Sequence, residues 1–277
     1  MERRAFVKIA YFGYDLFLPC FQTILNAGCE VLQVFLPPLE GFVTSTDRTA
    51  ALCDERGIPW TQTRVTATAL DELAAHGCEV LIRAGQSYRI PIHPALRGID
   101  VHPAPLPTGR GSWPWINTIL RGLPWSGVTI HKLTAELDAG DILIQRAYRV
   151  APDATCRDLE AIFVPLAAEL LRQVLADFDR FWSIATPQKE GEFWPAPTER
   201  DRIIRPGMPF EQVDRIVRAF YGYGCTLLPG GNAKVPILCA RALREDPGQE
   251  PGTRLDDNHY AIQGGILEIE AELEGSL

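Results

Sequence analysis

The first hundred residues alternate short apolar runs, of strand length, with segments in which apolar residues recur at helical spacing. The predicted strands cover residues 6–12, 30–35 and 80–82, and the predicted helices cover residues 16–27, 46–56 and 68–75. Asp15 is placed to cap the first helix and Gly28 to end it. Strands and helices that alternate in this way predict an α/β fold, Rossmann-like, with a mostly parallel sheet.

The middle of the chain predicts three further strands, over residues 99–101, 127–132 and 141–150. A long amphipathic helix then begins near Thr155, with Asp158 as its capping partner, and Pro165 predicts a kink or a break inside it. A helix over 209–220 and short strands between Gly/Pro turns predict a small β-barrel-like C-terminal domain. We therefore expect a catalytic domain over 1–187, a linker over 188–202 and an OB/barrel-like domain over 203–277.

Composition limits the classes of protein that this chain can be. It has 277 residues, of which 46% are hydrophobic and 22% charged, and no apolar run approaches the roughly 18 residues of a membrane span. The N-terminus, mildly basic over Met1–Arg4 and followed by an apolar run that Lys8 interrupts, is interpreted as a first strand and not as a signal peptide. Seven cysteines without a C-x-x-C pair favour reduced thiols in the cytoplasm. A net charge of −8 without a Lys/Arg cluster disfavours a nucleic-acid partner.

Candidate chemistry gathers between residues 98 and 145. His102 follows a predicted strand, two residues after Asp100, and precedes a loop stiffened by prolines. Neutral imidazole is suited to accept a proton near pH 7, which makes His102 a candidate base. Asp138 lies in an acidic turn, where Asp is also common for purely conformational reasons, and His131 could be a core or surface residue.

Several ligand classes lack their sequence signals. Gly13 is the only glycine after the first strand, so no G-x-G-x-x-G is present, and no Walker-type G-x-x-x-x-G-K-[ST] occurs. A dinucleotide or a nucleoside triphosphate is therefore not expected as the main ligand. No H-x-x-x-H or H-E-x-x-H spacing occurs, so a metal site is a minor alternative and none is predicted.

Three stretches of this region resemble the motifs of a known family. They read D-V-H-P-A-P-L-P-T-G-R-G, G-V-T-I-H and D-A-G-D-I, beside the family pattern N-x-H-P-S-L-L-P-x-x-R-G, G-V-T-x-H and D-x-G-x-I. The chain thus resembles the folate-dependent formyltransferases, a family that includes methionyl-tRNA, glycinamide ribonucleotide and sugar-nucleotide formyltransferases. The C-terminal segment is similar to the small β domain of the tRNA and sugar-nucleotide members, so the likeness covers nearly the whole chain.

The resemblance implies 10-formyltetrahydrofolate as formyl donor and a primary amine as acceptor. The likeness is greatest to enzymes that formylate an amino sugar on a nucleotide, of the 4-amino-arabinose type. Another small biosynthetic intermediate is also possible as the amine, and methionyl-tRNA is the alternative acceptor. His102 would take the proton of the attacking amine, and Asp138 would hold the imidazole, stabilise its cation or help to pass the proton onward. Oligomeric state is open, with a homodimer as one option.

Asp100 departs from the family pattern because it stands where the family has Asn. An Asn amide can donate a hydrogen bond to the oxyanion of the reaction, whereas an ionised Asp cannot. Asp100 could do so only if it were protonated, which requires a raised pKa. The alternatives are altered one-carbon chemistry, or a protein that only binds ligand.

The resemblance also implies two sets of binding residues. Residues expected at the folate are Arg83, Ala84, Gly85, Tyr88, Ile90, Leu137 and Gly140. Residues expected at the amine substrate are Pro105, Arg110 and Trp113.

Overall fold

The computed structural model describes residues 7–86, 88–231 and 233–272, and the chain divides into two compact units that interleave along the sequence. The first unit comprises Met1–Ser112, Gly127–Ala147 and Ile162–Phe193, and the second comprises Trp113–Ser126, Tyr148–Ala161 and Trp194–Leu277. The predicted contiguous domains, 1–187 and 203–277 with a linker over 188–202, stay a prediction. Among the described helices, none has the length and apolar character that a bilayer crossing requires.

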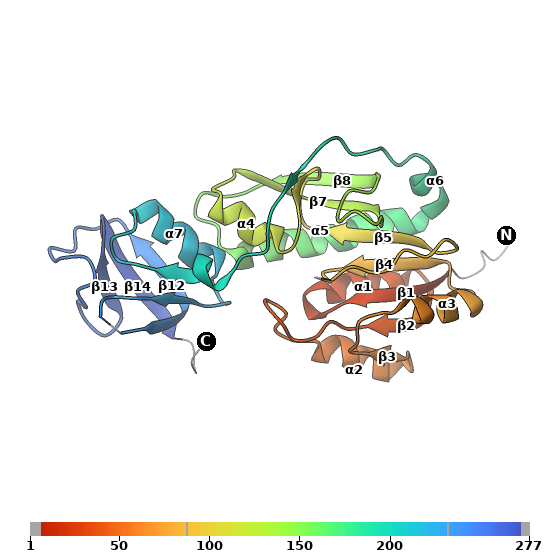
Figure 1. The fold of residues 1–277 in the computed structure, drawn as a ribbon, viewed down its shortest axis with the longest axis horizontal. Coiled ribbons are helices and arrows are strands. Elements are labelled where there is room, and N and C mark those ends of the chain that lie inside the picture. Colours follow the sequence, from red (N-terminus) through yellow and green to blue (C-terminus); the bar gives the residue numbers. More distant parts are fainter. Residues whose placement is uncertain (1–6, 87, 232, 273–277) are drawn as a thin grey trace. The chain divides into compact units, whose positions relative to one another are not determined.

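A seven-stranded sheet forms the centre of the first unit, in the order β3-β2-β1-β4-β5-β7-β8 (Figure 1). Its strands are β1 (Lys8–Gly13), β2 (Glu30–Phe35), β3 (Trp60–Thr61), β4 (Val80–Ala84), β5 (Arg97–His102), β7 (Trp125–Lys132) and β8 (Ile142–Arg149). Neighbouring strands from β3 to β5 run parallel, and β7 pairs antiparallel with β5. The predicted α/β class with a mostly parallel sheet is confirmed. Residue 6 of the predicted first strand lies outside the described residues.

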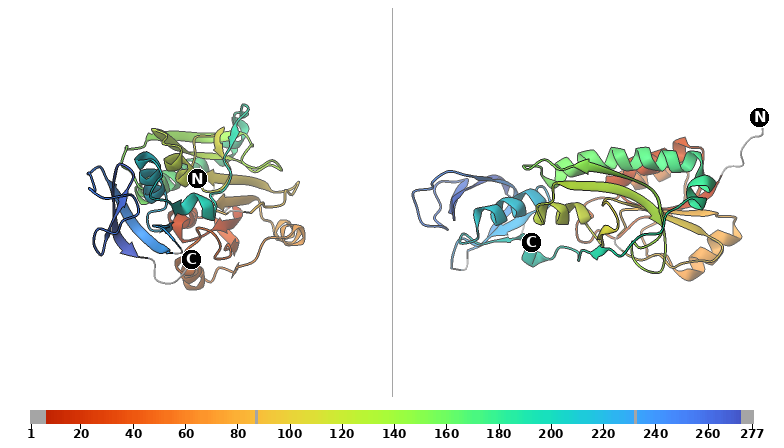
Figure 2. Two further views of the ribbon diagram at one scale, coloured as in Figure 1. Left: turned by 60° about the vertical axis from the view of Figure 1, so that its left-hand side comes forward. Right: turned by 90° about the horizontal axis from the view of Figure 1, so that it is seen from above.

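Helices cover both faces of this sheet because successive residues of a buried strand point to opposite sides. On one side Tyr11 of β1 stacks on Phe21, with ring centroids 4.9 Å apart. On the other side Phe12 joins an apolar cluster that includes Leu70 and Leu73. The first face thus carries α1 (Leu18–Asn26) and the second carries α3 (Ala67–Ala75). The right-hand view of Figure 2 shows α5 (Cys156–Ala176) along the same side as α1.

Two local predictions are wrong. Asp15 does not cap the helix that follows it. Its carboxylate instead accepts hydrogen bonds from Ser45 and from the Arg48 and Thr49 amides at the start of α2 (Asp47–Arg56). These donors are distant in sequence, and the first unpaired amides of any helix can recruit such a carboxylate. Of the kink or break predicted at Pro165, the break is wrong, because α5 continues through this residue; the kink stays a prediction.

The start of α5 agrees with the prediction. The amide and hydroxyl of Thr155 donate to the Asp158 carboxylate, at 2.9 and 2.7 Å, and the Asp158 amide donates back to the Thr155 hydroxyl at 3.3 Å. This reciprocal pair satisfies amides that have no partner within the helix.

The second unit contains a five-stranded sheet in the order β10-β11-β12-β14-β13. Its strands are β10 (Ile203–Ile204), β11 (Cys225–Leu227), β12 (Val235–Leu243), β13 (His259–Ile262) and β14 (Gly265–Glu272). Helix α7 (Phe210–Ala219) buries Val213, Ile216 and Val217 and contacts both β12 and α4 (Pro114–Leu120). The predicted C-terminal sheet domain is confirmed, and its barrel-like form stays a prediction.

Candidate active site

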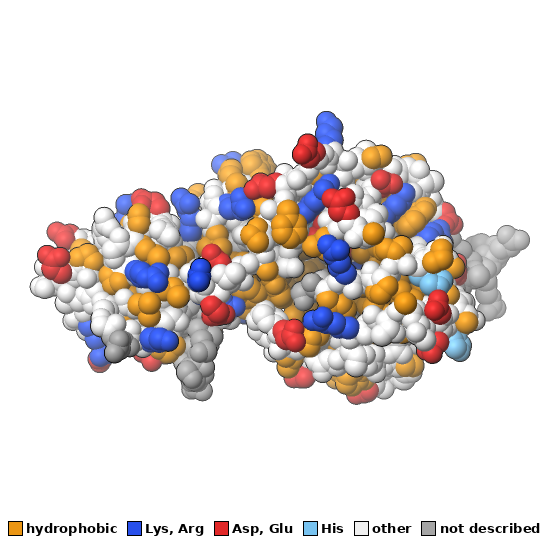
Figure 3. Space-filling model, viewed as in Figure 1, with side chains coloured by type: hydrophobic (Ala, Val, Ile, Leu, Met, Phe, Trp, Pro, Cys, Tyr) orange, Lys and Arg blue, Asp and Glu red, His pale blue; other side chains and the backbone are white. Residues whose placement is uncertain are grey.

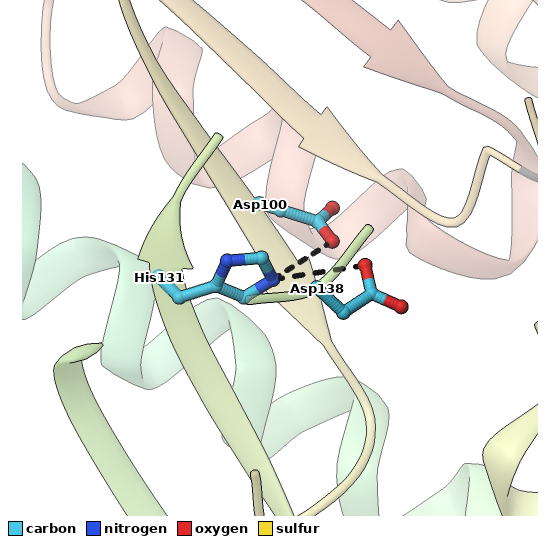
Figure 4. A group of neighbouring side chains, drawn as sticks. All are labelled: Asp100, His131 and Asp138. Atoms are coloured by element: carbon cyan, nitrogen blue, oxygen red, sulfur yellow. Dashed lines mark ion pairs between the residues drawn. The ribbon is translucent and has the colours of Figure 1, made fainter. Parts of the chain in front are cut away.

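Adjacent strands of the first unit bring three ionisable side chains together. Arg83 of β4 is the register partner of Asp100 of β5, and Asp100 is the partner of His131 of β7. Directly opposed residues of neighbouring strands point to the same face of a sheet, so the three side chains meet. Asp138, from the turn after β7, completes the group, and Figure 4 shows Asp100, His131 and Asp138 directed toward one another. All four residues are buried, none more than 6% exposed.

The acidic turn directs the Asp138 carboxylate inward. Asp138 has a φ of 53°, a left-handed conformation that Asp tolerates better than most residues. One carboxylate oxygen accepts from Nη2 of Arg83 at 2.9 Å and the other from the Gly111 amide at 2.8 Å. Gln188 holds the turn itself, since its Nε2 donates to the carbonyls of Asp138 and Gly140. The Asp138 carboxylate thus contacts Arg83 and Gly111, and its role is not limited to stabilising the turn.

The proline-rich loop fixes the tautomer of His102. Nε2 of His102 lies 2.8 Å from the carbonyl oxygen of Gly109, which can only accept, so we assign a proton to Nε2. In the neutral ring Nδ1 then carries a lone pair. Nδ1 lies 3.8 Å from Oδ2 of Asp138, too far for a hydrogen bond but close enough for a strong charge interaction. His102 therefore presents a proton acceptor beside a carboxylate.

Asp100 is held as an anion. Nε and Nη2 of Arg83 donate to its two oxygens at 2.8 and 2.7 Å. Burial would raise the pKa of Asp100, but the charge of Arg83 and the facing His131 outweigh it and hold this pKa well below its usual range. A raised pKa, the condition for Asp100 to donate to an oxyanion, is therefore contradicted. The same carboxylates raise the pKa of Arg83, against the effect of its burial.

His131 faces both carboxylates with one ring nitrogen. Its Nδ1 lies 2.8 Å from the carbonyl oxygen of Lys132 and so donates to it. Its Nε2 has no hydrogen-bond partner among the described residues, and lies 3.3 Å from Oδ2 of Asp100 and 3.9 Å from Oδ1 of Asp138. His131 is thus a core residue of the charged group, not a surface one.

A metal ion could in principle bind one atom from each of Asp100, His131 and Asp138, since these atoms lie within 4.8 Å of one another. However, Nη2 of Arg83 already bonds the two carboxylate oxygens that face His131. A divalent cation would have to share these oxygens with a guanidinium, so the geometry suits Arg83 better than a metal.

The residues expected at the folate lie in two loops of the first unit. Ala84 ends β4 and Gly85 follows with a φ of 85°, a conformation that favours glycine. Tyr88 is half-buried and donates to the Thr63 carbonyl at 3.4 Å, while Ile90 packs in the apolar cluster under α3. Leu137 and Gly140 lie in the acidic turn. Folate binding by these residues stays a prediction, and the Arg83 guanidinium is occupied by the carboxylates.

The residues expected at the amine substrate are more scattered. Pro105 is half-buried in the loop after His102. Arg110 donates to Oε1 of Gln188 and to the Lys189 carbonyl, beside the pairing of β6 (Thr108–Arg110) with β9 (Glu192–Phe193). Trp113 belongs to the second unit, where it packs edge-on against Trp115. Their substrate contacts stay a prediction.

Gln188 and the bridging position of Arg83 were not found from the sequence. Gln188 lies fifty residues beyond Asp138, in a segment without a motif. Arg83 gave a signal, as a charged residue inside an otherwise apolar strand of sequence V-L-I-R-A. A charge in such a run is expected only where a buried partner exists.

Comparison with known proteins agrees with the motifs. A family model described as "Formyl transferase" matches residues 47–175. A methionyl-tRNA formyltransferase of Herpetosiphon aurantiacus is 31% identical over 89% of this chain and 88% of its own length. The chain belongs to the folate-dependent formyltransferase family. Another methionyl-tRNA formyltransferase, of Treponema denticola, is 34% identical over 56% of this chain, a stretch that spans about half of that protein.

Two solved structures share the fold of this chain. HypX from Aquifex aeolicus, in complex with tetrahydrofolic acid, aligns with a TM-score of 0.69 and 19% identity, over 94% of this chain but 43% of its own. An N-formyltransferase from Helicobacter canadensis, in complex with folinic acid and dTDP-3-aminofucose, aligns with a TM-score of 0.66 and 14% identity, over 95% and 98% of the two chains. This formyltransferase therefore keeps the family fold along nearly its whole length.

Proposed function

We propose that this enzyme transfers the formyl group of 10-formyltetrahydrofolate to the primary amine of a small, nucleotide-linked amino sugar. The observation that carries the proposal is the free Nδ1 of buried His102 beside the Asp138 carboxylate. Such a pair is suited to remove a proton from an amine as it attacks a carbonyl carbon.

The proposed reaction has two steps. The amine nitrogen forms a bond to the formyl carbon and loses a proton to Nδ1 of His102, and the Asp138 carboxylate stabilises the imidazolium cation. When the tetrahedral intermediate collapses, the bond from the formyl carbon to N10 of the folate breaks. The proton then passes from Nδ1 to N10, which leaves tetrahydrofolate and the formamide. Asp100 has no assigned proton in this scheme, because Arg83 holds it ionised.

Two observations favour a small acceptor over methionyl-tRNA. The net charge is −8, whereas binding to nucleic acid depends largely on Lys and Arg at phosphates. On the face drawn in Figure 3 the basic and acidic side chains are interspersed, without a basic stripe. The Helicobacter canadensis neighbour was solved with dTDP-3-aminofucose, an amino sugar on a nucleotide. Methionyl-tRNA is the second candidate, because the sequence relatives named above are methionyl-tRNA formyltransferases.

The test measures tetrahydrofolate release from 10-formyltetrahydrofolate with a panel of nucleotide-linked amino sugars and with charged initiator methionyl-tRNA. We expect release with an amino-sugar nucleotide and a loss of about 10²- to 10⁴-fold in His102→Ala, the usual contribution of a general base. His93→Ala is the matched control, because His93 is a half-buried histidine that also pairs with an aspartate, Asp71, but lies outside the group around His102. Release with the tRNA alone would move the proposal to the second candidate, and no release with any amine would refute both.

A further inference from the structure

Arg83 occupies a position that the reaction scheme does not use. Its guanidinium leaves β4 and makes three hydrogen bonds, two to Asp100 and one to Asp138. Nη2 alone bridges the two carboxylates, at 2.7 Å from Oδ2 of Asp100 and 2.9 Å from Oδ1 of Asp138. Removal of this one group would leave two buried carboxylates facing each other.

The balance of charge in the group depends on that bridge. The side chains of Asp100 and Asp138 are each 2% exposed, and one carboxylate oxygen of Asp100 lies within 4.8 Å of one of Asp138. Two buried carboxylates this close cannot both stay ionised without a cation, and one of them would take up a proton. His131 is the other group that faces them, but its contacts are longer, at 3.3 and 3.9 Å.

We propose that Arg83 is a positioning residue for formyl transfer, whose guanidinium bridges Asp100 and Asp138 and so keeps Asp138 available as an anion beside His102. This inference rests on the proposed function, since it assigns Asp138 the task of stabilising the His102 cation. The charged and titratable groups around Asp138 are Arg83 of β4, Asp100 and His102 of β5 and His131 of β7. Among them Arg83 is the group that bonds both carboxylates directly.

The Arg83 guanidinium allows an acid at position 100, because it pairs with both oxygens of the Asp100 carboxylate. Asp100 fixes the Arg83 guanidinium by two hydrogen bonds, one from Nε and one from Nη2. Nη2 then donates a further hydrogen bond to Asp138. Asp100 and Arg83 therefore form one unit whose charges cancel. If the guanidinium is removed, the carboxylates of Asp100 and Asp138 repel each other, and one of the two takes up a proton.

The test compares Arg83→Met, Asp100→Asn and the double variant in the pH profile of kcat/KM between about pH 5 and pH 9. In Arg83→Met we expect the acid limb to move up by about one to three pH units, and activity near neutral pH to fall at least tenfold. Asp100→Asn should keep the acid limb of the wild type, because Arg83 still pairs with Asp138. The double variant should restore that limb, because one carboxylate remains where two repelled each other.

A purely structural role for Arg83 would lower activity without this pattern. An unchanged acid limb in Arg83→Met, or a double variant no better than Arg83→Met, would overturn the inference. If Arg83→Met does not fold, Arg83→Lys replaces it: the charge is kept, so a wild-type acid limb is expected, and a raised limb would contradict the proposal.

A readout without substrate separates this inference from the proposed function. Carboxyl ¹³C NMR of the aspartates should show an additional carboxyl that titrates near neutral pH in Arg83→Met, and none in the wild type or the double variant. If the wild type transfers no formyl group, the proposed function fails, and the titration alone then decides whether Arg83 holds both carboxylates ionised.

Discussion

Replacement of Asp138 by Asn removes the charge beside His102 and keeps the shape of the side chain. Oδ2 of Asp138 lies 3.8 Å from Nδ1 of His102, the atom that gains a proton in the proposed reaction. At an effective dielectric constant of about 20, two unit charges at this distance attract by about 4 kcal/mol. Arg83 neutralises part of the carboxylate charge, so we expect a loss of about 2–4 kcal/mol of transition-state stabilisation, or roughly 30- to 1,000-fold in kcat/KM.

The assay is tetrahydrofolate release with the amine that the wild type uses, at saturating donor. Asp141→Asn is the matched control because Asp141 belongs to the same turn, yet its carboxylate pairs with Lys132 at 3.0 Å and not with His102. The control should stay within about threefold of the wild type, as expected for a partly exposed ion pair. If Asp138→Asn also stays within threefold, the charge does not stabilise His102 and the reasoning fails.

Two further predictions concern how the chain positions these groups and how it resists acid. A Cβ on Gly140 would overlap the carbonyl oxygen of Lys132. Gly140→Ala should therefore displace the acidic turn, lower the free energy of unfolding in urea by about 1–3 kcal/mol and lower kcat. Gly207→Ala, where a Cβ would enter open space, should change neither quantity, and equal behaviour of the two variants would rule this prediction out. For Asp15, burial acts to raise the pKa, but hydrogen bonds from Ser45 and the start of α2 outweigh it, so its folded-state pKa is lowered. The stability that Asp15 contributes is therefore present above its unfolded-state pKa of about 4 and is lost as the pH falls. Asp15→Asn should flatten the dependence of the free energy of unfolding on pH below about pH 5. Parallel curves of this free energy against pH for variant and wild type would contradict the prediction.

The sequence predicts the order of strands and helices well because hydrophobic spacing is a local signal. The strand over 30–35 has the predicted bounds, and the helix over 46–56 is correct to within one residue. Asp15 shows what a local signal cannot predict. The residue has the right identity for a helix cap, but the amide of Thr49 that it binds is 34 residues further along the chain. Pro165 shows the reverse case, because α5 continues through a residue whose local preference is to end a helix.

The sequence pointed to some residues of the candidate site, but not to the ionisation state of Asp100 or to the contacts of Arg83 and Gln188, and the catalytic roles stay predictions. His102 and Asp138 follow from the motif and the turn, and the structure places them 3.8 Å apart. The ionised state of Asp100 could not be predicted, because it depends on a register that pairs Asp100 with Arg83 across two strands. The hydrogen bond from Gln188 to the Asp138 carbonyl could not be predicted for the same reason, since only the fold brings these two residues together.

The bridge of Arg83 between two acids constrains the order in which residues 83 and 100 can be exchanged. A lineage that starts from the neutral Asn of the family pattern can gain Arg83 first, since Asp138 already offers it a partner. If Asp100 came first, it would stand unpaired beside Asp138 and be costly. The same order holds in reverse, so a return to Asn at position 100 has to precede the loss of Arg83.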